Sequence, residues 1–436
     1  MTQTTEGGRY SDAAMTERSG LDGASSGAEN QRALRVLTGL VLRPGGPRFG
    51  GAANAARLLA KHVAKLVSVD FAEMADRDEE NPWEGGSYYF CKSYAVPRGL
   101  RRVPPFRSPL VGALTVSSIP RLLRRGGYDL LHIHNLHPIW AAAHMVWSCR
   151  RIGKPSVFTT HGLYEAMHYD SVAGLSRWGS ALYRFGGLTP LRYVVRKSTR
   201  VIALTPADIE YLDEMGVDRE RVAVIPNGVD SRFLAQASEE ELRRVRAKYR
   251  LAHSPVLLFV GRVIRSKGLD VLVRMAARLE GDWQMLIVGY HDDPAHAREL
   301  VALANAERCA ERIKFIGDAP SEDLPLLYGL ADIFVYPTLA DTMPLVVLEA
   351  MASRAPVVAS RVGGIPYELG ESAGLTVEAG DPVELAEAVG RLLADEGLRR
   401  EMGEAGRRRV EAEFTWDRIA RMTVEVYRQV ASEAAS

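Results

Sequence analysis

The stretch from residue 333 to residue 368 constrains the fold more than any other part of the chain, because it carries every part of a βαβ unit. An apolar run, Ile333–Tyr336, predicts a short buried strand that ends at a proline. A polar loop then leads into a helix that we expect from about Met343 to Ser353. A second apolar run, Pro356–Ser360, predicts another buried strand, and a Gly-Gly turn follows it. Ligands of open α/β sheets bind at the carboxyl ends of such strands.

Two acids flank the start of the predicted helix, Asp341 in the loop and Glu349 on the helix itself. A helix start offers free N–H groups and a partial positive charge, which suit a phosphate. Carboxylates beside a phosphate repel it, but they can accept hydrogen bonds from hydroxyls on either side of it. A nucleotide-sugar, which is a diphosphate with a sugar at each end, has this arrangement of groups. The alternative is that Asp341 or Thr342 only caps the helix and Glu349 is a surface charge.

Strands alternate with helical patterns along both halves of the chain, which predicts an α/β fold with two doubly wound, mostly parallel sheets. We expect one sheet from residues 34–41, 67–70, 129–134, 156–160, 200–204 and 221–226. We expect the other from residues 256–260, 283–289, 312–318, 332–337, 356–360 and 374–377.

A length of 436 residues favours two or three domains. Residues 1–32 are polar and rich in Gly and Ser, which predicts a disordered tail rather than a signal peptide. We expect Rossmann-like domains at residues 33–230 and 231–412, since the charged helix Glu239–Arg250 marks the passage between them. The amphipathic residues 413–436 predict a last helix that packs back across the hinge.

Composition excludes several classes of protein. A net charge of +1 argues against a general nucleic-acid binder. The three cysteines are odd in number and widely spaced, so neither a disulfide framework nor a zinc site is indicated. A reducing, cytoplasmic location is the simplest expectation. The sequence contains no run of about 18 apolar residues, so we expect no transmembrane helix.

Two segments of the first half are basic and contain no acid. Residues 92–128 carry eight Arg or Lys, and residues 171–207 carry six together with Trp178, Tyr183 and Phe185. Such segments suit peripheral contact with an anionic membrane, on its inner face, or the holding of an anionic acceptor. The alternative is a solvated basic face that acids elsewhere balance.

Other candidate residues follow predicted strands. Arg262 and Lys267 lie in a strand-to-helix loop, where two cations are well placed to neutralise a leaving diphosphate, although surface charges are the alternative. His161 follows directly after a strand, which favours a functional role over the structural one usual for a lone histidine. Gly50 and Gly51 precede a helix and permit close backbone approach to a phosphate or sugar, although most Gly-Gly pairs are only turns.

Taken together, these motifs resemble the retaining glycosyltransferases of family 4, which have two Rossmann-like domains in the GT-B fold. The resemblance runs from about Leu34 to the C-terminus. The motifs stand in the family's order and spacing: Gly50-Gly51, THG at 160–162, PNGVD at 226–230, GRVIRSKG at 261–268, DTMPLVVLEAMAS at 341–353 and VGGIPYE at 362–368.

The resemblance implies a donor-binding second domain and an acceptor-binding first domain. It implies that Arg262 and Lys267 bind and stabilise the leaving diphosphate, and that Glu349 accepts hydrogen bonds from the ribose. It also implies places for the other candidates. His161 would lie beside the donor sugar, and the backbone around Met343, Pro344 and Leu345 would face the phosphate and sugar. Phe315 to Asp318 would line the nucleotide pocket, and Gly50 and Gly51 would line the acceptor side of the cleft.

Two departures from the family pattern bear on the site. Asp341 stands where the family has the first Glu of a Glu-x7-Glu motif, so the side chain near the donor sugar is one methylene shorter. The segment VGYHDDP at 288–294 replaces a glycine-rich turn, which bears on the nucleotide pocket.

The activity that the resemblance implies is transfer of a hexose, with retention of anomeric configuration, from a UDP- or GDP-sugar to a hydroxyl of a sugar, glycolipid or small molecule. The pathway would be polysaccharide, glycolipid or glycoside biosynthesis. No cofactor, obligatory metal or nucleic-acid partner is implied. A non-catalytic relic, a nucleotide-sugar epimerase and a phosphorylase are the alternatives. A dinucleotide-dependent oxidoreductase is disfavoured because the G-x-G-x-x-G fingerprint is absent.

Overall fold

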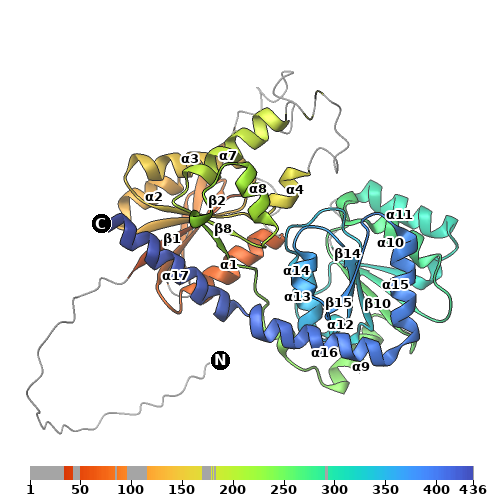
Figure 1. Cartoon of the computed structure of the whole chain (residues 1–436). Coiled ribbons are helices and arrows are strands. Elements are labelled where there is room, and N and C mark those ends of the chain that lie inside the picture. Colours follow the sequence, from red (N-terminus) through yellow and green to blue (C-terminus); the bar gives the residue numbers. More distant parts are fainter. Residues whose placement is uncertain are drawn as a thin grey trace, which may run out of the picture. The chain divides into compact units, whose positions relative to one another are not determined.

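The computed structural model describes residues 34–42, 50–83, 86–95, 115–168, 178, 180, 183–289 and 293–435, with backbone alone at 95, 185 and 186 (Figure 1). The predicted tail at residues 1–32 lies outside the described residues. The same holds for much of the two basic segments and for Tyr290, His291 and Asp292 of the VGYHDDP segment.

The first sheet has the strand order β3-β4-β2-β1-β6-β7-β8-β9, and β5 pairs with β4. All its pairs are parallel except β3 with β4 and β4 with β5. Its strands are β1 (Arg35–Leu40), β2 (Ser68–Ala75), β3 (Glu79–Trp83), β4 (Gly86–Ala95), β5 (Thr115–Ser117), β6 (Leu130–His134), β7 (Ser156–Thr159), β8 (Arg200–Ala203) and β9 (Val222–Val224).

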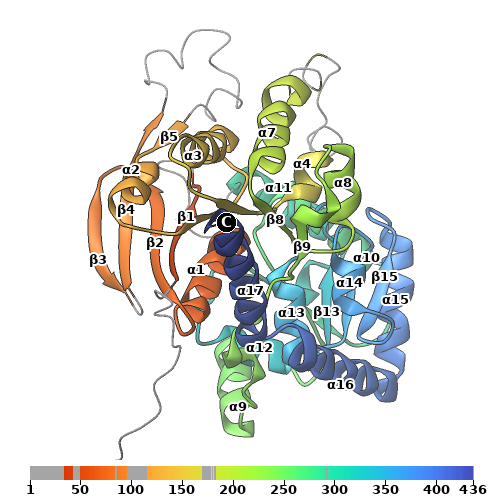
Figure 2. The same cartoon turned by 60° about the vertical axis from the view of Figure 1, so that its left-hand side comes forward.

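Helices cover both faces of this sheet (Figures 1 and 2). Helices α2 and α3 lie over one face, and α1 lies over the other. The helices of this part are α1 (Gly51–Val63), α2 (Ile119–Arg125), α3 (Ile139–Arg151), α4 (Leu163–Met167), α7 (Thr189–Lys197) and α8 (Asp208–Glu214), with a π-helix at Arg184–Leu188 and 3-10 turns at Arg219–Arg221 and Ser231–Leu234.

The second sheet is wholly parallel, with the order β12-β11-β10-β13-β14-β15. Counted from its own first strand, this is the 3-2-1-4-5-6 order of the doubly wound fold. The strand order therefore reverses between β10 and β13, and the crevice at their carboxyl ends is the expected ligand site. The strands are β10 (Val256–Val260), β11 (Gln284–Val288), β12 (Ile313–Gly317), β13 (Ile333–Tyr336), β14 (Val357–Ser360) and β15 (Gly374–Val377).

Buried apolar runs such as VLLFV in β10 form this sheet because helices cover both of its faces. The helices of this part are α9 (Glu239–Lys248), α10 (Leu269–Ala276), α11 (Pro294–Ala306), α12 (Leu324–Leu330), α13 (Leu345–Ala352), α14 (Ile365–Leu369), α15 (Pro382–Ala394) and α16 (Glu396–Glu413), with 3-10 turns at Arg265–Lys267 and Ala310–Arg312. The chain ends in a further helix, α17 (Trp416–Ala435). The two doubly wound, Rossmann-like sheets predicted from the sequence are confirmed. The domain boundaries at residues 230 and 412 stay a prediction.

The C-terminal helix α17 packs against α1, on the first sheet rather than the second. Its buried residues include Val424, Tyr427 and Val430, and they belong to the hydrophobic core of the first sheet. Among the described residues, no helix has both the length and the apolar character needed to cross a membrane.

Candidate active site

Lys267 and Asp341 meet at the point where the strand order of the second sheet reverses. Lys267 ends the 3-10 turn that follows β10, and Asp341 lies in the loop that follows β13. The ammonium of Lys267 forms an ion pair with Oδ2 of Asp341. Both side chains are largely buried, with exposed fractions of 11% and 14%. The structure therefore brings two of the predicted catalytic residues into direct contact at the expected ligand crevice.

The phenol of Tyr336 completes this pair. Its hydroxyl donates a hydrogen bond of 2.8 Å to Oδ2 of Asp341, and the ammonium of Lys267 lies 5.5 Å from the centre of its ring. Tyr336 is the last residue of β13 and is buried. Asp341 is thus held by two partners on one carboxylate oxygen.

A second carboxylate, that of Glu165 on α4, joins the surroundings of Lys267. The hydroxyl of Thr342 donates to Oε2 of Glu165 and accepts from the N–H of Tyr164 at 3.0 Å. Burial raises the pKa of Glu165, and the charge of Asp341 raises it further, while Lys267 lowers it. The positive charge of Lys267 therefore acts on two neighbouring carboxylates, those of Asp341 and Glu165.

Glu368 on α14 is a third acid near Asp341. Its side chain is fully buried, and neither of its oxygens has a hydrogen-bond partner among the described residues. Burial raises the pKa of Glu368 well above its ordinary value, and the charge of Asp341 adds to this effect. Burial and the charge of Asp341 therefore both favour the neutral, protonated form of Glu368.

The start of α13 has no side-chain cap, which a phosphate site requires. Pro344 is its N-cap, no side chain caps it, and its first turn holds no acid. Leu345 is the first helical residue, so the helix is shorter than the predicted Met343–Ser353. The loop before it is fixed, because the carbonyl of Met343 accepts from the amide of Asn227 at 2.9 Å.

Close backbone packing explains the two glycine turns beside this loop. Gly363 has φ of +52°, and a Cβ there would overlap the carbonyl oxygen of Asp341. Gly268 has φ of +65°, and a Cβ there would overlap the carbonyl oxygen of Pro337. Both glycines hold the β13–α13 loop against its neighbours.

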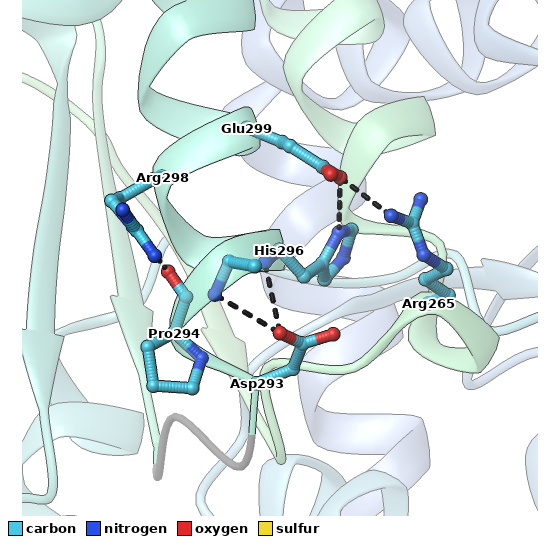
Figure 3. Close-up of polar contacts among 7 residues, drawn as sticks. Arg265, Asp293, Pro294, His296, Arg298 and Glu299 are labelled. Atoms are coloured by element: carbon cyan, nitrogen blue, oxygen red, sulfur yellow. Dashed lines mark hydrogen bonds and ion pairs between the residues drawn. The ribbon is translucent and has the colours of Figure 1, made fainter.

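The start of α11, by contrast, is closed to anions (Figure 3). Oδ1 of Asp293 accepts from the N–H groups of Ala295 and His296 at 3.0 and 3.1 Å. These hydrogen bonds hold the pKa of Asp293 below its ordinary value. Figure 3 also shows Glu299 between His296 and Arg265, with an ion pair of 2.7 Å to Arg265. The VGYHDDP departure thus places a capping carboxylate where a free helix start would attract phosphate.

Glu349 lies on α13 and has a different partner from Asp341. Its Oε2 accepts a hydrogen bond of 2.9 Å from the hydroxyl of Tyr328 on α12. Burial raises the pKa of Glu349 to about 7, and the hydrogen bond from Tyr328 opposes this effect. Near neutral pH, Glu349 can therefore switch between a hydrogen-bond acceptor and a neutral acid.

The remaining candidates lie at both sheets, Arg262 and Phe315 at the second and Gly50 and Gly51 at the first. Arg262 is exposed just after β10, and Phe315 on β12 is partly buried against the second core. Gly50 and Gly51 are exposed at the start of α1, where a Cβ would meet nothing within 4 Å. Helix α1 has no side-chain cap and no acid in its first turn, so its N–H groups are open to a ligand.

His161 belongs to a row of buried histidines at the carboxyl ends of the central strands β6 and β7. Its Nε2 lies 3.2 Å from Nδ1 of His134 at the end of β6. The ring of His132 lies 3.9 Å from that of His134 and contacts the hydroxyl of Tyr427 at 2.5 Å. Burial lowers the pKa of His161 to about 4, so the ring is neutral at pH 7. Nε2 of His134 is buried with no partner among the described residues.

Sequence reasoning missed Glu165, Glu368, Tyr336 and His134 as site residues. Glu165 stands one helical turn after His161, and His134 ends a predicted strand, so each had a positional signal in the sequence. Glu368 ends the VGGIPYE motif but was given no role, and Tyr336 had no signal because it resembles a core residue of its strand.

Family models match both halves of the chain. The model described as Glycosyltransferase Family 4 matches residues 49–233, and the model described as Glycosyl transferases group 1 matches residues 243–409.

Individual proteins agree with these models. The D-inositol 3-phosphate glycosyltransferase of Salinispora tropica is 32% identical over 324 residues, which cover 71% of this chain and 65% of that protein. The alpha-maltose-1-phosphate synthase of Mycolicibacterium smegmatis is 35% identical over 298 residues, which cover 64% of this chain and 74% of that protein. The structure of a sucrose-phosphate synthase from Thermosynechococcus elongatus matches with a TM-score of 0.74 at 25% identity, over 92% of this chain and all of that one.

Two doubly wound, Rossmann-like α/β sheets in one chain, together with the likeness to the sucrose-phosphate synthase structure, define a GT-B protein. The chain belongs to the glycosyltransferases of group 1 and family 4. The predicted membership of glycosyltransferase family 4 and the predicted GT-B fold are therefore confirmed, whereas retention of anomeric configuration stays a prediction.

Proposed function

We propose that this protein transfers a hexose from a nucleotide-sugar to an acceptor hydroxyl, with retention of anomeric configuration and without an obligatory metal. The observation that carries the proposal is the Lys267–Asp341 pair beside the open start of α13, at the switch point of the second sheet. Cation, free N–H groups and carboxylate are the three kinds of group that a diphosphate linked to a sugar requires.

Lys267 stabilises the leaving group. An ammonium has three N–H donors, and the carboxylate of Asp341 holds the ammonium in place while the other donors face the diphosphate. Negative charge develops on the diphosphate oxygen as the glycosidic bond breaks, and fixed donors aimed at that oxygen lower the barrier. Arg262 and the N–H groups at the start of α13 share this task.

Asp341 has a double role in this proposal. Its Oδ2 fixes Lys267 and accepts from Tyr336, and its Oδ1 accepts from a hydroxyl of the donor sugar. Glu349, which lies on α13 itself, accepts a hydrogen bond from the ribose when its carboxylate is ionised. His161, neutral at pH 7, lies on the sugar side together with His134.

The acceptor hydroxyl attacks on the face that the leaving diphosphate vacates, which gives retention. The relatives are named for D-inositol 3-phosphate, maltose-1-phosphate and sucrose-phosphate. Together with the basic first half of this chain, these names favour an acceptor that bears a phosphate or belongs to a glycolipid. The pathway is then glycolipid, polysaccharide or glycoside biosynthesis.

The test is a transfer assay with purified protein, UDP- and GDP-hexoses, and a panel of free sugars, sugar phosphates and glycolipids. Proton NMR of the product reports the anomeric configuration, which should equal that of the donor. An inverted product would contradict retention. Product without any acceptor would favour an epimerase, and no turnover despite nucleotide-sugar binding would favour the non-catalytic relic.

A further inference from the structure

An apolar groove of about 740 Å³ lies on the α3 face of the first sheet, and none of its lining residues belongs to the site just described. Residues of β4, β5, α3 and α7 line it, among them Tyr94, Trp140, Trp147, Pro190 and Tyr193. Its volume falls within the usual range of ligand-binding pockets. The proposed transfer reaction uses none of these residues.

The groove exposes an unusual amount of aromatic surface. Trp140, His144 and Trp147 stand at helical spacing on one face of α3, and the two indoles are 39% and 48% exposed. Tyr94 on β4 is 45% exposed and Val116 on β5 is 42% exposed. Contiguous apolar surface of this kind on a folded domain marks an interaction site.

Positive charge borders the groove, and Asp78, which accepts from the N–H of Lys92 at 2.6 Å, is an acid close to its rim. The four elements that line it contain no Asp or Glu. The guanidinium of Arg151 lies 5.2 Å from the ring of Trp147, and the ammonium of Lys92 lies 5.6 Å from the ring of Tyr94. Exposed cations on α3 and α7 add to them: Arg150, Arg192, Arg196 and Lys197.

The charge is a property of this region and not of the whole chain. Residues 85–164 hold a single acid, Asp129, although the net charge of the protein is only +1. That carboxylate is engaged inside the fold, where it accepts from the N–H of Arg35 at 2.8 Å. The first half of the molecule is therefore strongly basic around an apolar groove.

We propose that this groove and its basic rim form a docking surface for an anionic lipid bilayer. Tryptophan and tyrosine favour the membrane–water interface, because one end of each ring system is apolar and the other polar. Lysine and arginine beside them attract anionic headgroups. The lining is almost wholly apolar, so it suits a lipid acyl chain better than the polar edges of nucleic-acid bases.

The groove starts at the edge of the sheet that carries His134 and His161. Helix α3 begins at Ile139, five residues after the end of β6, and Trp140 stands in its first turn. Docking through this surface would hold that edge of the first sheet close to the membrane, where a lipid-borne acceptor is available.

Co-sedimentation of the full-length protein with vesicles tests the proposal. We expect binding to vesicles of phosphatidylglycerol and phosphatidylcholine in equal parts, weakened by salt, and little binding to phosphatidylcholine alone. The Trp140→Ser/Trp147→Ser double variant should bind the anionic vesicles at least roughly tenfold more weakly, since membrane affinity follows buried apolar area. Lys92→Gln/Arg151→Gln should weaken binding to anionic vesicles.

A matched control removes two exposed valines far from the groove. Val301 on α11 and Val383 on α15 are 45% and 49% exposed, so Val301→Ser/Val383→Ser should leave vesicle binding unchanged. Equal binding by the tryptophan variant and the wild type would overturn the proposal, as would absence of wild-type binding to anionic vesicles. Tighter wild-type binding to a single-stranded oligonucleotide than to vesicles would also overturn it. A melting temperature lowered only in the tryptophan variant would show that the indoles pack within the protein, which contradicts docking.

Discussion

At the scale of single residues, we propose that the contact between Lys267 and Asp341 lets a shorter acid serve at this position. The carboxylate reaches the ammonium and the hydroxyl of Tyr336 through the same oxygen, so the lost methylene is compensated by neighbours from β13 and the loop after β10. The pair is poorly exposed, and its electrostatic effect on a bound diphosphate is therefore weakly screened by water.

Replacement of Lys267 tests this arrangement. Lys267→Ala should lower kcat by roughly 100-fold or more, which is the usual loss when one group that stabilises transition-state charge is removed. Because the variant leaves Asp341 without its cation, its melting temperature should be compared with that of Lys267→Ala/Asp341→Asn. A double variant that regains stability but not turnover would separate folding from catalysis. Near-wild-type kcat in Lys267→Ala would contradict the proposed role.

Glu349 should make donor binding depend on pH. Its pKa is raised to about 7, so the carboxylate that accepts from the ribose forms as the pH rises through neutrality. The KM for the donor should therefore fall between pH 6 and pH 8 in the wild type. Glu349→Gln should raise that KM and flatten the profile, with a smaller effect on kcat. A pH dependence that persists unchanged in Glu349→Gln would count against the assignment.

The same raised pKa fixes the sign of a stability effect. The folded protein keeps the proton of Glu349 to a higher pH than the unfolded chain does, so stability falls as the pH rises from about 4.5 to about 7 and then levels off. Melting temperatures of wild type and Glu349→Gln across this range should diverge in that direction. Parallel curves would show that the group titrates as it does in the unfolded chain.

The sequence predicted the residue types of the site better than their contacts. Asp341 and Glu349 stood out because they flank a helix start in one predicted βαβ unit, and Lys267 because it lies in another strand-to-helix loop. Glu165 and Tyr336 could not be found in this way, since their importance depends on which loops the fold brings together. Likewise, His161 was predicted from its strand-end position, whereas its contact with His134 required the pairing of β6 with β7.

At the scale of elements, two helix starts of the second sheet differ in what they offer to an anion. The start of α13 has no capping side chain, whereas Asp293 caps that of α11. The predicted helix at 343–353 begins later because Pro344 is extended, with ψ of 120°. A tight glycine turn after β10 then holds the loop that carries Asp341.

Gly268 provides a test of that turn. Gly268→Ala should destabilise the protein by at least about 1–3 kcal/mol, because alanine is strained at positive φ and its Cβ would also displace Pro337. The displaced loop carries Asp341, so turnover should fall as well. The matched control is Gly281→Ala, where φ is +78° but the space around the Cβ is open. Equal losses of activity in both variants would contradict a special role for the β13–α13 loop.

The parallel strands were predictable because each is an apolar run between turn signals, and β3, β4 and β5 were not. Strand β3 contains two acids and a proline, and half of β4 lies in the basic segment that we interpreted by its charge. These strands pair antiparallel at the sheet edge, where one face meets solvent and the hydrophobic signal is weak.

At the scale of the whole molecule, the last helix of the chain packs into the core that its first strands and helices form. Helix α17 follows the second sheet in sequence but completes the core of the first, and the hydroxyl of Tyr427 satisfies Nδ1 of His132. An amphipathic last helix was predictable from the sequence, but the surface that receives it was not.

The Tyr427→Phe variant measures how much the contact between Tyr427 and His132 contributes to the stability of the protein. The variant leaves a buried imidazole nitrogen without its partner, which should cost about 1–3 kcal/mol of stability. The control is Tyr94→Phe, at a tyrosine that is 45% exposed. Equal melting temperatures for Tyr427→Phe and wild type would show that the contact contributes nothing.

The most direct test of the central claim, that the protein binds a nucleotide-sugar, is a thermal-shift screen of the wild type. The ligands are UDP-, GDP-, ADP- and dTDP-sugars, with NAD(P) as the comparison. A donor at 100 times its dissociation constant should add about 2.7 kcal/mol of stability, visible as a clear rise in melting temperature. We predict such a rise with the sugars of one nucleotide class. No rise with any nucleotide-sugar, or a rise with NAD(P) alone, would contradict the account.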